Sequence, residues 1–333
     1  MAPHPQRLTV TRRAWPLARP LMTAHGVQTA ADVVVAEISD GDSRGRGEGV
    51  PLARHGESID SVVATLEGMR GAVTSGLNRD TLQGALPPGA ARNALDCAFW
   101  AIDADRAYCS VADLAGLGTV APVVTAFTLT LGTPENMAEQ AAAHRSRSLL
   151  RLELGGDGDD ERVRAVRQAA PAARLIVDAA ERWTEHQFGA FMPTLVECRV
   201  QLIEQPLPAD ADDALAGLAP PIPLWADESC RTRADLDRLD GKYQGIAIKL
   251  DKAGGLTEAL ALAAEARQRG LRVMVGGGVG TSLGVAPALL VAQGAEMVAL
   301  DGPLHLAQDR PGGLRYEGST IYPAAAGFWG GVG

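Results

Sequence analysis

Three carboxylates in the middle of the chain are spaced so that they could bind a metal ion together. Asp178, Glu204 and Asp227 each stand at the end of a short apolar run. If those runs are neighbouring parallel strands of a barrel, their carboxyl ends meet at one rim. Hard oxygen ligands suit Mg²⁺, which takes few carboxylates and keeps water or substrate oxygens. A single such residue could equally start a loop or cap a helix, but three in register without a cation would repel one another.

A lysine follows the next apolar run. Lys249 is one of only three lysines among the 31 basic residues, the other 28 being arginine. Its place one strand beyond the carboxylates predicts that it faces the same rim. A lysine beside a metal ion can have a lowered pKa and serve as a general base. The alternative is a surface lysine whose ammonium group lies in solvent.

The elements that must position these residues form a repeating pattern from about residue 120. Short apolar runs alternate with Ala-rich, charged helical stretches, and successive runs begin roughly 23 to 26 residues apart. Eight such strand–helix units are what a TIM barrel requires. A doubly wound open sheet would have fewer units and a glycine-rich first turn, which is absent. The eight runs lie at 123–127, 149–154, 175–177, 200–203, 223–226, 246–250, 272–275 and 297–300.

The rest of the chain predicts a second, smaller unit. Residues 7–12 and 31–38 have strand patterns, and helical patterns follow at about 57–76 and 90–106. The C-terminal segment contains no ninth unit, so we expect it to pack back on the N-terminal region. The fold class is therefore α/β, a modified (β/α) barrel with an α+β capping domain. The predicted division is 1–117 for the cap, 118–303 for the barrel and 304–333 for the segment that packs on the cap.

Composition excludes several classes of function. Apolar residues make up 46% of the chain and charged residues 21%, which is typical of a globular protein. The net charge of −9 disfavours nucleic-acid binding, and no long uncharged apolar stretch predicts a membrane span. No signal peptide is visible, and four scattered cysteines fit a reducing cytoplasm. Oligomeric state is left open, although symmetric homo-oligomers are common among such enzymes.

Several motifs resemble one family across nearly the whole chain. The chain resembles the dipeptide epimerases in the muconate-lactonizing branch of the enolase superfamily. The motifs are WPLARP at 15–20, GRGEGVP at 45–51, IEQPL at 203–207, ADES at 226–229, IKLDKAGG at 248–255 and VGTSLG at 279–284.

The resemblance implies a capping domain over a modified TIM barrel and a small-molecule carboxylate substrate. It implies that Mg²⁺ binds the substrate carboxylate and stabilises an enediolate made by removing the α-proton. In the epimerases a lysine at each face of the substrate removes and returns that proton, and Lys249 matches the one on the sixth strand. Asp251 and Asp301 match acidic positions expected near the ammonium group of a dipeptide.

The second strand departs from the family pattern in a way that matters for function. The family has Lys-x-Lys there, whereas this chain has Arg151 and Glu153. Arg151 can still neutralise a substrate carboxylate, but Glu153 reverses the charge of the second acid/base. Glu153 could be the opposite-face base with a pKa raised by burial, could pair with Arg151 or Lys249, or could reach the metal. Loss of catalysis is the remaining interpretation.

Other positions differ as well. The Asp-x-Asp of the eighth strand has become Ala299-Leu300-Asp301, and Ala180 stands where an asparagine is expected. The N-terminal loop that usually offers an arginine to the substrate has His25, which could donate a hydrogen bond or simply lie exposed. The seventh strand ends at Gly276-Gly277-Gly278, which enlarges that side of the mouth and could alternatively cradle a phosphate.

Three functions compete on this reasoning. The first is a Mg²⁺-dependent epimerase or racemase acting on a dipeptide or N-acyl amino acid. The second is a one-base cycloisomerase or dehydratase that uses Lys249 alone. The third is a non-catalytic metal-binding homologue.

Overall fold

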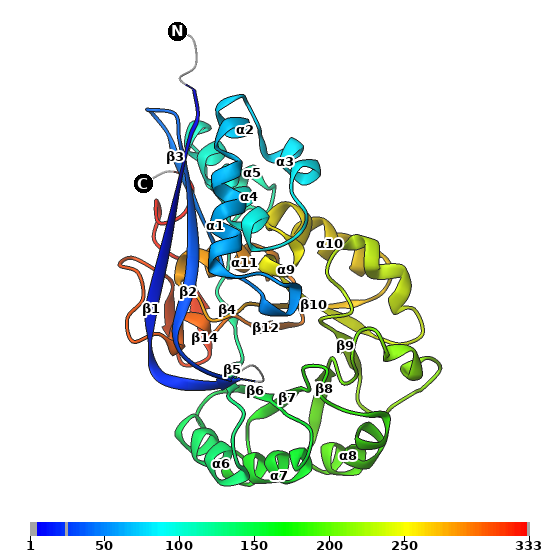
Figure 1. The fold of residues 1–333 in the computed structure, drawn as a ribbon. Helices are drawn as coiled ribbons and strands as arrows, with labels where there is room; N and C mark the ends of the chain where they lie inside the picture. Colours follow the sequence, from blue (N-terminus) through cyan, green and yellow to red (C-terminus); the bar gives the residue numbers. More distant parts are fainter. Residues whose placement is uncertain (1–4, 24–25, 332–333) are drawn as a thin grey trace.

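The computed structural model describes residues 5–23 and 26–331. Its N-terminal part is an antiparallel sheet covered by helices (Figure 1). The sheet has the order β1 (Arg7–Thr23), β2 (Gly26–Ser39) and β3 (Arg44–Gly49). Its strands extend beyond the predicted ranges, and the predicted helix at 57–76 is two helices. The helices are α1 (Ile59–Gly68), α2 (Arg70–Thr74), α3 (Arg79–Ala85), α4 (Ala90–Arg106) and α5 (Val111–Leu114), with η1 (Ala53–His55) before them.

Helix α4 lies directly on β3 because the strand presents glycines to it. A Cβ atom on Gly47 would stand 2.1 Å from the carbonyl oxygen of Ala94, and one on Gly45 would stand equally close to that of Ala98. Side chains at these two positions would therefore force the helix off the sheet. The alternate residues of β3 point away from α4 and toward the barrel and C-terminal segment.

The barrel confirms the predicted (β/α) architecture. Eight parallel strands run in chain order around one sheet, and they are nearly closed at the seam between the first and last. There Val298 O accepts a hydrogen bond of 2.7 Å from Ala126 N, and Thr125 Oγ1 accepts one of 2.9 Å from Leu300 N. The strands are β5 (Phe127–Leu129), β6 (Leu149–Glu153), β7 (Arg174–Asp178), β8 (Val200–Glu204), β9 (Leu224–Ala226), β10 (Gly245–Lys249), β11 (Arg272–Gly276) and β12 (Met297–Ala299). The connecting helices are α6 (Pro134–Ala143), α7 (Asp159–Ala169), α8 (Glu185–Glu197), η2 (Asp212–Leu215), η3 (Arg233–Leu239), α9 (Leu250–Ala253), α10 (Leu256–Gln268) and α11 (Ser282–Val291).

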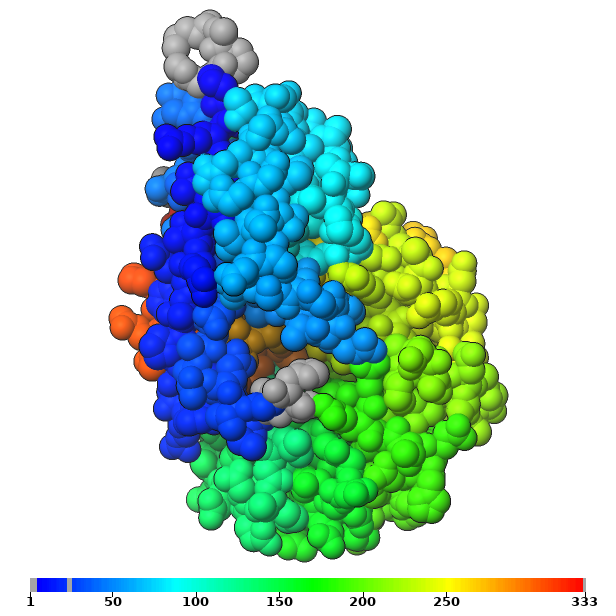
Figure 2. Space-filling model, in the orientation of Figure 1, coloured from blue at the N-terminus to red at the C-terminus, as the bar shows by residue number. Residues whose placement is uncertain are grey.

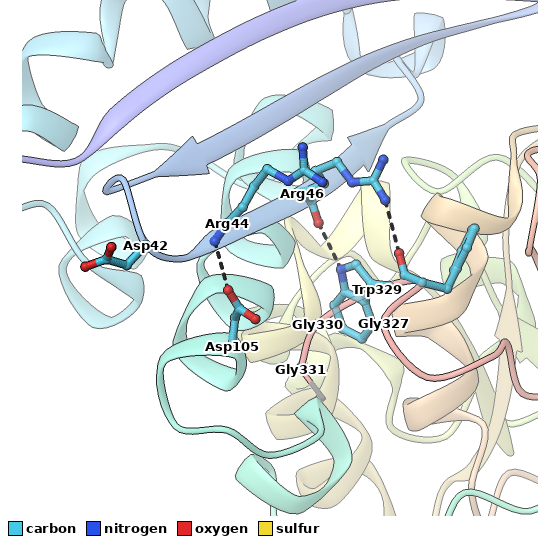
Figure 3. A pocket seen from close by; sticks show the side chains of 9 residues that line it. Asp42, Arg44, Arg46, Asp105, Gly327, Trp329, Gly330 and Gly331 are labelled. Carbon is cyan, nitrogen blue, oxygen red and sulfur yellow. Dashed lines mark hydrogen bonds between the residues drawn. The ribbon is translucent and has the colours of Figure 1, made fainter. Parts of the chain in front are cut away.

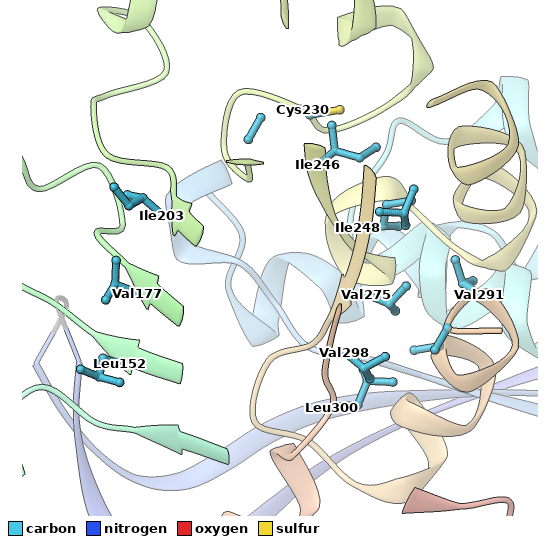
Figure 4. Close-up of a cluster of buried hydrophobic side chains, with 14 of the residues drawn as sticks. Leu152, Val177, Ile203, Cys230, Ile246, Ile248, Val275, Val291, Val298 and Leu300 are labelled. Atoms are coloured by element: carbon cyan, nitrogen blue, oxygen red, sulfur yellow. The ribbon is translucent and has the colours of Figure 1, made fainter. Parts of the chain in front are cut away.

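Alternation along each strand divides the barrel side chains into two cores. Residues such as Leu152, Val177 and Ile248 belong to the large outer core, part of which Figure 4 shows. A smaller inner cluster contains one residue from each strand or the position just before it. Its members are Ala126, Leu149, Ile176, Leu202, Trp225, Ala247, Met274 and Ala299. This inner layer forms the floor on which the polar residues at the strand ends rest.

The C-terminal segment returns to the N-terminal sheet. After η4 (Gly302–His305) it forms β13 (Arg315–Glu317) and β14 (Thr320–Tyr322), and β14 pairs with β4 (Val123–Val124). Farther on, the Trp329 indole donates a hydrogen bond of 2.9 Å to Arg46 O, and Arg46 donates one of 3.2 Å to Phe328 O. These contacts line a pocket of about 390 Å³ between β3 and the segment (Figure 3). No helix among the described residues is long and apolar enough to cross a membrane.

Candidate functional site

The strand alternation brings the predicted site residues to one end of the barrel. In seven of the eight strands, the residue two positions after the inner-cluster member is polar, and in β11 it is Gly276. These seven residues are Thr128, Arg151, Asp178, Glu204, Asp227, Lys249 and Asp301, and Glu153 is two positions beyond Arg151. A period of two therefore explains why all of them face inward above the apolar floor.

A cavity of about 180 Å³ lies over this polar layer. Arg151, Glu153, Asp178, Lys249 and Asp301 line it. The hairpin of β1 and β2 contributes as well, because Leu21 forms part of the wall. Figures 1 and 2 show this hairpin running from the capping helices down to the green part of the barrel. The cap therefore helps enclose the cavity.

Arg151 joins two of the predicted metal ligands. Its Nε donates a hydrogen bond of 2.8 Å to Glu204 Oε2, and its Nη2 donates one to Asp178 Oδ2. All three side chains are nearly fully buried. Burial and the neighbouring Asp178 carboxylate raise the pKa of Glu204 despite the attraction of Arg151. The arginine thus holds Asp178 and Glu204 together by bridging their carboxylates.

Two lysines hold the third predicted ligand. Lys252 Nζ donates hydrogen bonds of 2.6 Å to Asp227 Oδ1 and 2.8 Å to Ala247 O, and Lys249 Nζ donates one to Asp227 Oδ2. Although burial opposes ionisation of Asp227, the two ammonium groups lower its pKa. The carboxylates of Asp227 and Glu204 in turn raise the pKa of Lys249, outweighing its burial. Lys249 differs from Lys252 because it also lines the cavity.

Gln205 fixes the backbone on which Asp227 stands. Its Oε1 accepts hydrogen bonds from Asp227 N (2.9 Å) and Ser229 N (3.0 Å), while its Nε2 donates to Leu207 O and to the hydroxyls of Ser229 and Tyr243. Gln205 has a φ of 37°, a left-handed conformation unusual for a non-glycine residue. The IEQPL motif therefore supplies both a carboxylate and the support for its neighbour.

The donor chemistry at this rim fits a divalent metal ion. Within residues 5–23 and 26–331, no three acidic, histidine or cysteine side chains are grouped as a metal site, and cations bridge the carboxylates instead. Two buried carboxylate oxygens, Glu204 Oε1 and Glu228 Oε2, nevertheless have no hydrogen-bond partner in the part of the chain that the structure describes. Burial followed by the charges of Asp227 and Asp178 raises the pKa of Glu228 to about 9. The layer thus contains oxygen donors and negative charge that a cation would satisfy.

Glu153 lies at the end of β6, in register with Asp178 on β7. Burial raises its pKa to about 7, with Asp178 adding to the shift and Arg151 opposing it. No ion pair joins Glu153 to Arg151 or Lys249 in the described part of the chain. Its position on the cavity wall keeps open the prediction that it faces the substrate.

Asp301 is held by two neighbours, one of which the sequence reasoning missed. Its Oδ2 accepts a hydrogen bond of 2.6 Å from Thr128 N and lies 3.1 Å from His305 Nε2. His305 also lines the cavity. The signal available in the sequence was a histidine four residues after the last strand's acidic residue, a spacing that one helical turn brings together.

Two of the predicted substrate contacts, Asp251 and His25, are not among the residues that line this cavity in the described part of the chain. The chain turns into α9 directly after Lys249, so Asp251 lies under the cap, where its Oδ1 accepts hydrogen bonds from Val50 N (2.9 Å) and Asn93 Nδ2 (2.6 Å). Burial raises its pKa to about 7. Asp251 lines a much smaller pocket, which shares Gly277 and Gly278 with the cavity over the polar layer. His25 lies outside the described residues.

Comparisons with known proteins agree along the whole chain. Residues 6–116 match the mandelate racemase / muconate lactonizing enzyme N-terminal domain, and residues 135–327 match the enolase C-terminal domain-like family. The chain is 43% identical over 315 residues to the L-Ala-D/L-Glu epimerase of Escherichia coli (strain K12), covering 94% of this chain and 98% of that one. It is 40% identical over 302 residues to the N-acetyl-D-glutamate racemase of Pseudoalteromonas sp, covering 90% and 96%.

Solved structures give the same picture. An enolase family member from Agrobacterium tumefaciens with homology to dipeptide epimerases, solved with bound sodium and L-Ala-L-Glu, has a TM-score of 0.96 and 46% identity. The match covers 98% of this chain and 100% of that one. A dipeptide epimerase from Cytophaga hutchinsonii, complexed with Mg and D-Ala-L-Val, has a TM-score of 0.89 and 25% identity, covering 96% and 93%.

Proposed function

Because this chain belongs to the mandelate racemase/muconate lactonizing enzyme family of the enolase superfamily and is an isomerase of the epimerase or racemase type, we propose that it inverts the carbon next to a carboxylate in a dipeptide or an N-acyl amino acid. The observation that carries this proposal is the cavity lined by Lys249 on one strand and Glu153 on another, above the carboxylates. Relatives at 43% and 40% identity are named for these two substrate classes.

Asp178, Glu204 and Asp227 would hold Mg²⁺ in this proposal. Support comes from their oxygen donors, from Glu204 Oε1, which accepts no hydrogen bond among the described residues and lies 3.7 Å from Lys249 Nζ, and from the magnesium and sodium named in the related structures. A bound divalent cation would offset the negative charge that develops on the substrate carboxylate when the α-proton leaves. Arg151 and Lys249, which now bridge the carboxylates, would then be released toward the cavity they already line.

Lys249 would exchange the α-proton at one face of the substrate. Removing that proton leaves its electron pair on the substrate as an enediolate, and inversion requires a proton to return at the opposite face. In an eight-stranded barrel, β6 and β10 stand four strands apart, so Glu153 and Lys249 approach the cavity from opposite sides. The second proton would therefore come from the Glu153 side. Arg151, Asp251, Asp301 and His25 remain predicted substrate contacts.

Proton exchange in D₂O tests this function. The purified chain with Mg²⁺ would be incubated with L-Ala-L-Glu, L-Ala-D-Glu and each enantiomer of N-acetylglutamate, and NMR and chiral chromatography would follow deuterium uptake and inversion. We expect uptake with inversion for at least one pair. Exchange or elimination without inversion would instead support the one-base enzyme. No reaction, with retained Mg²⁺ binding, would support the non-catalytic homologue.

A Glu153→Lys variant tests whether Glu153, rather than Arg151 on the same strand, sets the substrate preference. If Glu153 alone changed the substrate preference from dipeptide to another carboxylate, this variant gains inversion of L-Ala-L-Glu. Arg151→Lys is the matched control, because it alters the same strand without changing charge. Gain by the control alone would contradict a decisive role for Glu153.

We also propose the chain division and location that the sequence predicts. The hydrogen bonds that join Trp329 and Phe328 to Arg46 of β3 support a segment from 304 that packs on the cap region, while β14 of the same segment pairs with β4 at the start of the proposed barrel. Four free cysteines support a reducing cytoplasm. Limited proteolysis between the proposed units tests the division.

A further inference from the structure

Asp301 and His305 form part of the wall of the cavity over the polar layer at the strand ends. His305 ends η4, and its Nε2 lies 3.1 Å from Asp301 Oδ2. A carboxylate only accepts hydrogen bonds, so Nε2 carries the proton of a neutral ring and Nδ1 is then the basic nitrogen. Among the described residues, no hydrogen bond to Nδ1 occurs. The basic nitrogen of a cavity-lining histidine is thus unengaged.

The pair is held in place from the neighbouring strand. Asp301 accepts hydrogen bonds from Thr128 N (2.6 Å) and Thr128 Oγ1 (3.2 Å), and the Phe127 ring stacks on His305 with centroids 5.3 Å apart. The imidazole is mostly buried, with a side-chain exposure of 10%. Its ring plane and tautomer are both fixed, as an acid/base histidine requires.

The position of His305 relative to Lys249 completes the argument. Both residues line the same cavity of about 180 Å³. His305 follows β12, which lies two strands from β6 through β5 and two strands from β10 through β11. The charge of Glu153 acts on the His305 ring, so the histidine stands near Glu153, where the proposed function needs a proton donor and acceptor that is not Lys249.

We propose that His305, oriented by Asp301, is the acid/base residue for the substrate face opposite Lys249. This assignment rests on the proposed function and deepens it. In one direction the substrate Cα–H bond breaks, its proton moves to His305 Nδ1 and its electron pair stays on the substrate. A proton from the Lys249 ammonium then forms the new Cα–H bond on the other face. The reverse direction uses the same two groups in opposite order.

Face-specific exchange tests the assignment. With the four substrates above in D₂O, His305→Asn should lower inversion about 100-fold or more, while Lys249 still exchanges the α-proton of one stereoisomer. Lys249→Met should show the converse, with exchange confined to the other stereoisomer. His144→Asn is the matched control, because His144 also stacks on Phe127 (3.9 Å between centroids) but does not line the cavity. It should keep inversion within about twofold, as expected for a half-buried residue outside the cavity.

A second measurement does not depend on substrate. The groups that face His305 are Asp301, Glu153, Arg147 and His144, and although burial opposes it, the Asp301 hydrogen bond and charge raise the pKa of His305 above its ordinary value. Titration of the His305 ring by ¹⁵N NMR should show this pKa falling in Asp301→Asn, with Nδ1 as the nitrogen that gains the proton. A proton gained at Nε2 instead would overturn the assignment.

The outcomes separate the two proposals. If the wild-type chain inverts a substrate and His305→Asn does so at a similar rate, the histidine assignment fails and the proposed function stands. Equal loss of exchange at both faces in His305→Asn would show that His305 has a structural role, and this result would also overturn the assignment of His305 as an acid/base residue. Glu153→Gln retaining two-face exchange supports the histidine, whereas loss of one face only in that variant would give the role to Glu153. No exchange by the wild-type chain with any substrate would overturn both proposals.

Discussion

The two sides of the barrel mouth are built from different interactions. On the side of β7 to β10, buried carboxylates are bridged by Arg151, Lys249 and Lys252. On the side of β12, β5 and β6, Asp301 is held by a backbone amide, a hydroxyl and an imidazole, and Glu153 has no ion-pair partner among the described residues. The charged network suits a cation and a substrate carboxylate, whereas the hydrogen-bonded side suits proton transfer at one fixed atom.

The difference shows which chemistry is shared with relatives and which belongs to this chain. The motifs that resemble the dipeptide epimerases, IEQPL and IKLDKAGG, build the charged side. The departures Glu153 and Ala299 lie on the other side, as does His305, whereas Arg151 and Ala180 depart within the charged side. Glu153 is the departure that reverses a charge, so the second proton transfer is where a different substrate or mechanism would enter.

The largest expected effect comes from removing the cavity lysine of the charged side. Lys249→Met should lower the inversion rate about 10³-fold, because a positioned acid/base residue contributes that order of acceleration. Stopped-time chiral assays would measure it, with circular dichroism as the check of folding. If the rate falls less than tenfold, the charged side does not supply a proton and the contrast between the two sides breaks down.

Lys252→Met should instead act on stability. Lys252 contacts the same carboxylate as Lys249 but does not line the cavity, and its loss leaves Asp227 with one cation fewer. Breaking a buried pair of this kind costs about 3 kcal/mol of unfolding free energy. Urea unfolding would measure the change. Arg269→Met, which breaks surface pairs with Asp237 and Glu265, is the control and should cost at most about 1 kcal/mol.

Much of the charged side was predictable, and much of the other side was not. Strand alternation and the spacing of apolar runs suffice to place Asp178, Glu204 and Asp227 at one rim, because each stands at the end of a regular strand or directly after it, two positions beyond an inward residue. The position of Asp251 beneath the cap could not be predicted, since the chain leaves the strand at Lys249 and the next turn is helical. His305 was not found, because it stands in a short 3₁₀ turn whose direction depends on the contact between Asp301 and Thr128 across the barrel seam. Bridging of the carboxylates by Arg151 also depends on side-chain packing rather than on strand pattern.

Magnesium should stabilise the charged side and leave the other unchanged. A ligand that binds only the folded state adds about 2.7 kcal/mol at 100 times its Kd. Thermal unfolding with increasing MgCl₂ should show a rising midpoint that EDTA reverses. In Glu204→Gln the rise should be much smaller, whereas Glu153→Gln should keep it. Loss of the rise in both variants would place Glu153 among the ligands and erase the distinction between the two sides.

The effect that is smallest for a single step of its variable, one pH unit, is a pH dependence at Asp251, which marks where the charged side ends beneath the cap. Burial raises the pKa of Asp251 to about 7, above the value of about 3.9 in an unfolded chain. Between these values the folded protein keeps a proton that the unfolded chain has lost, so Asp251 makes stability fall as pH rises and has no further effect above about 7. Asp251→Asn cannot ionise and keeps an oxygen for Val50 N. The stability of wild type minus that of the variant should therefore fall by about 1.4 kcal/mol per pH unit between pH 5 and 7. Parallel stability curves from urea unfolding would show that Asp251 is ionised in the folded protein, which would extend the network of charges from Asp227 to the underside of the cap.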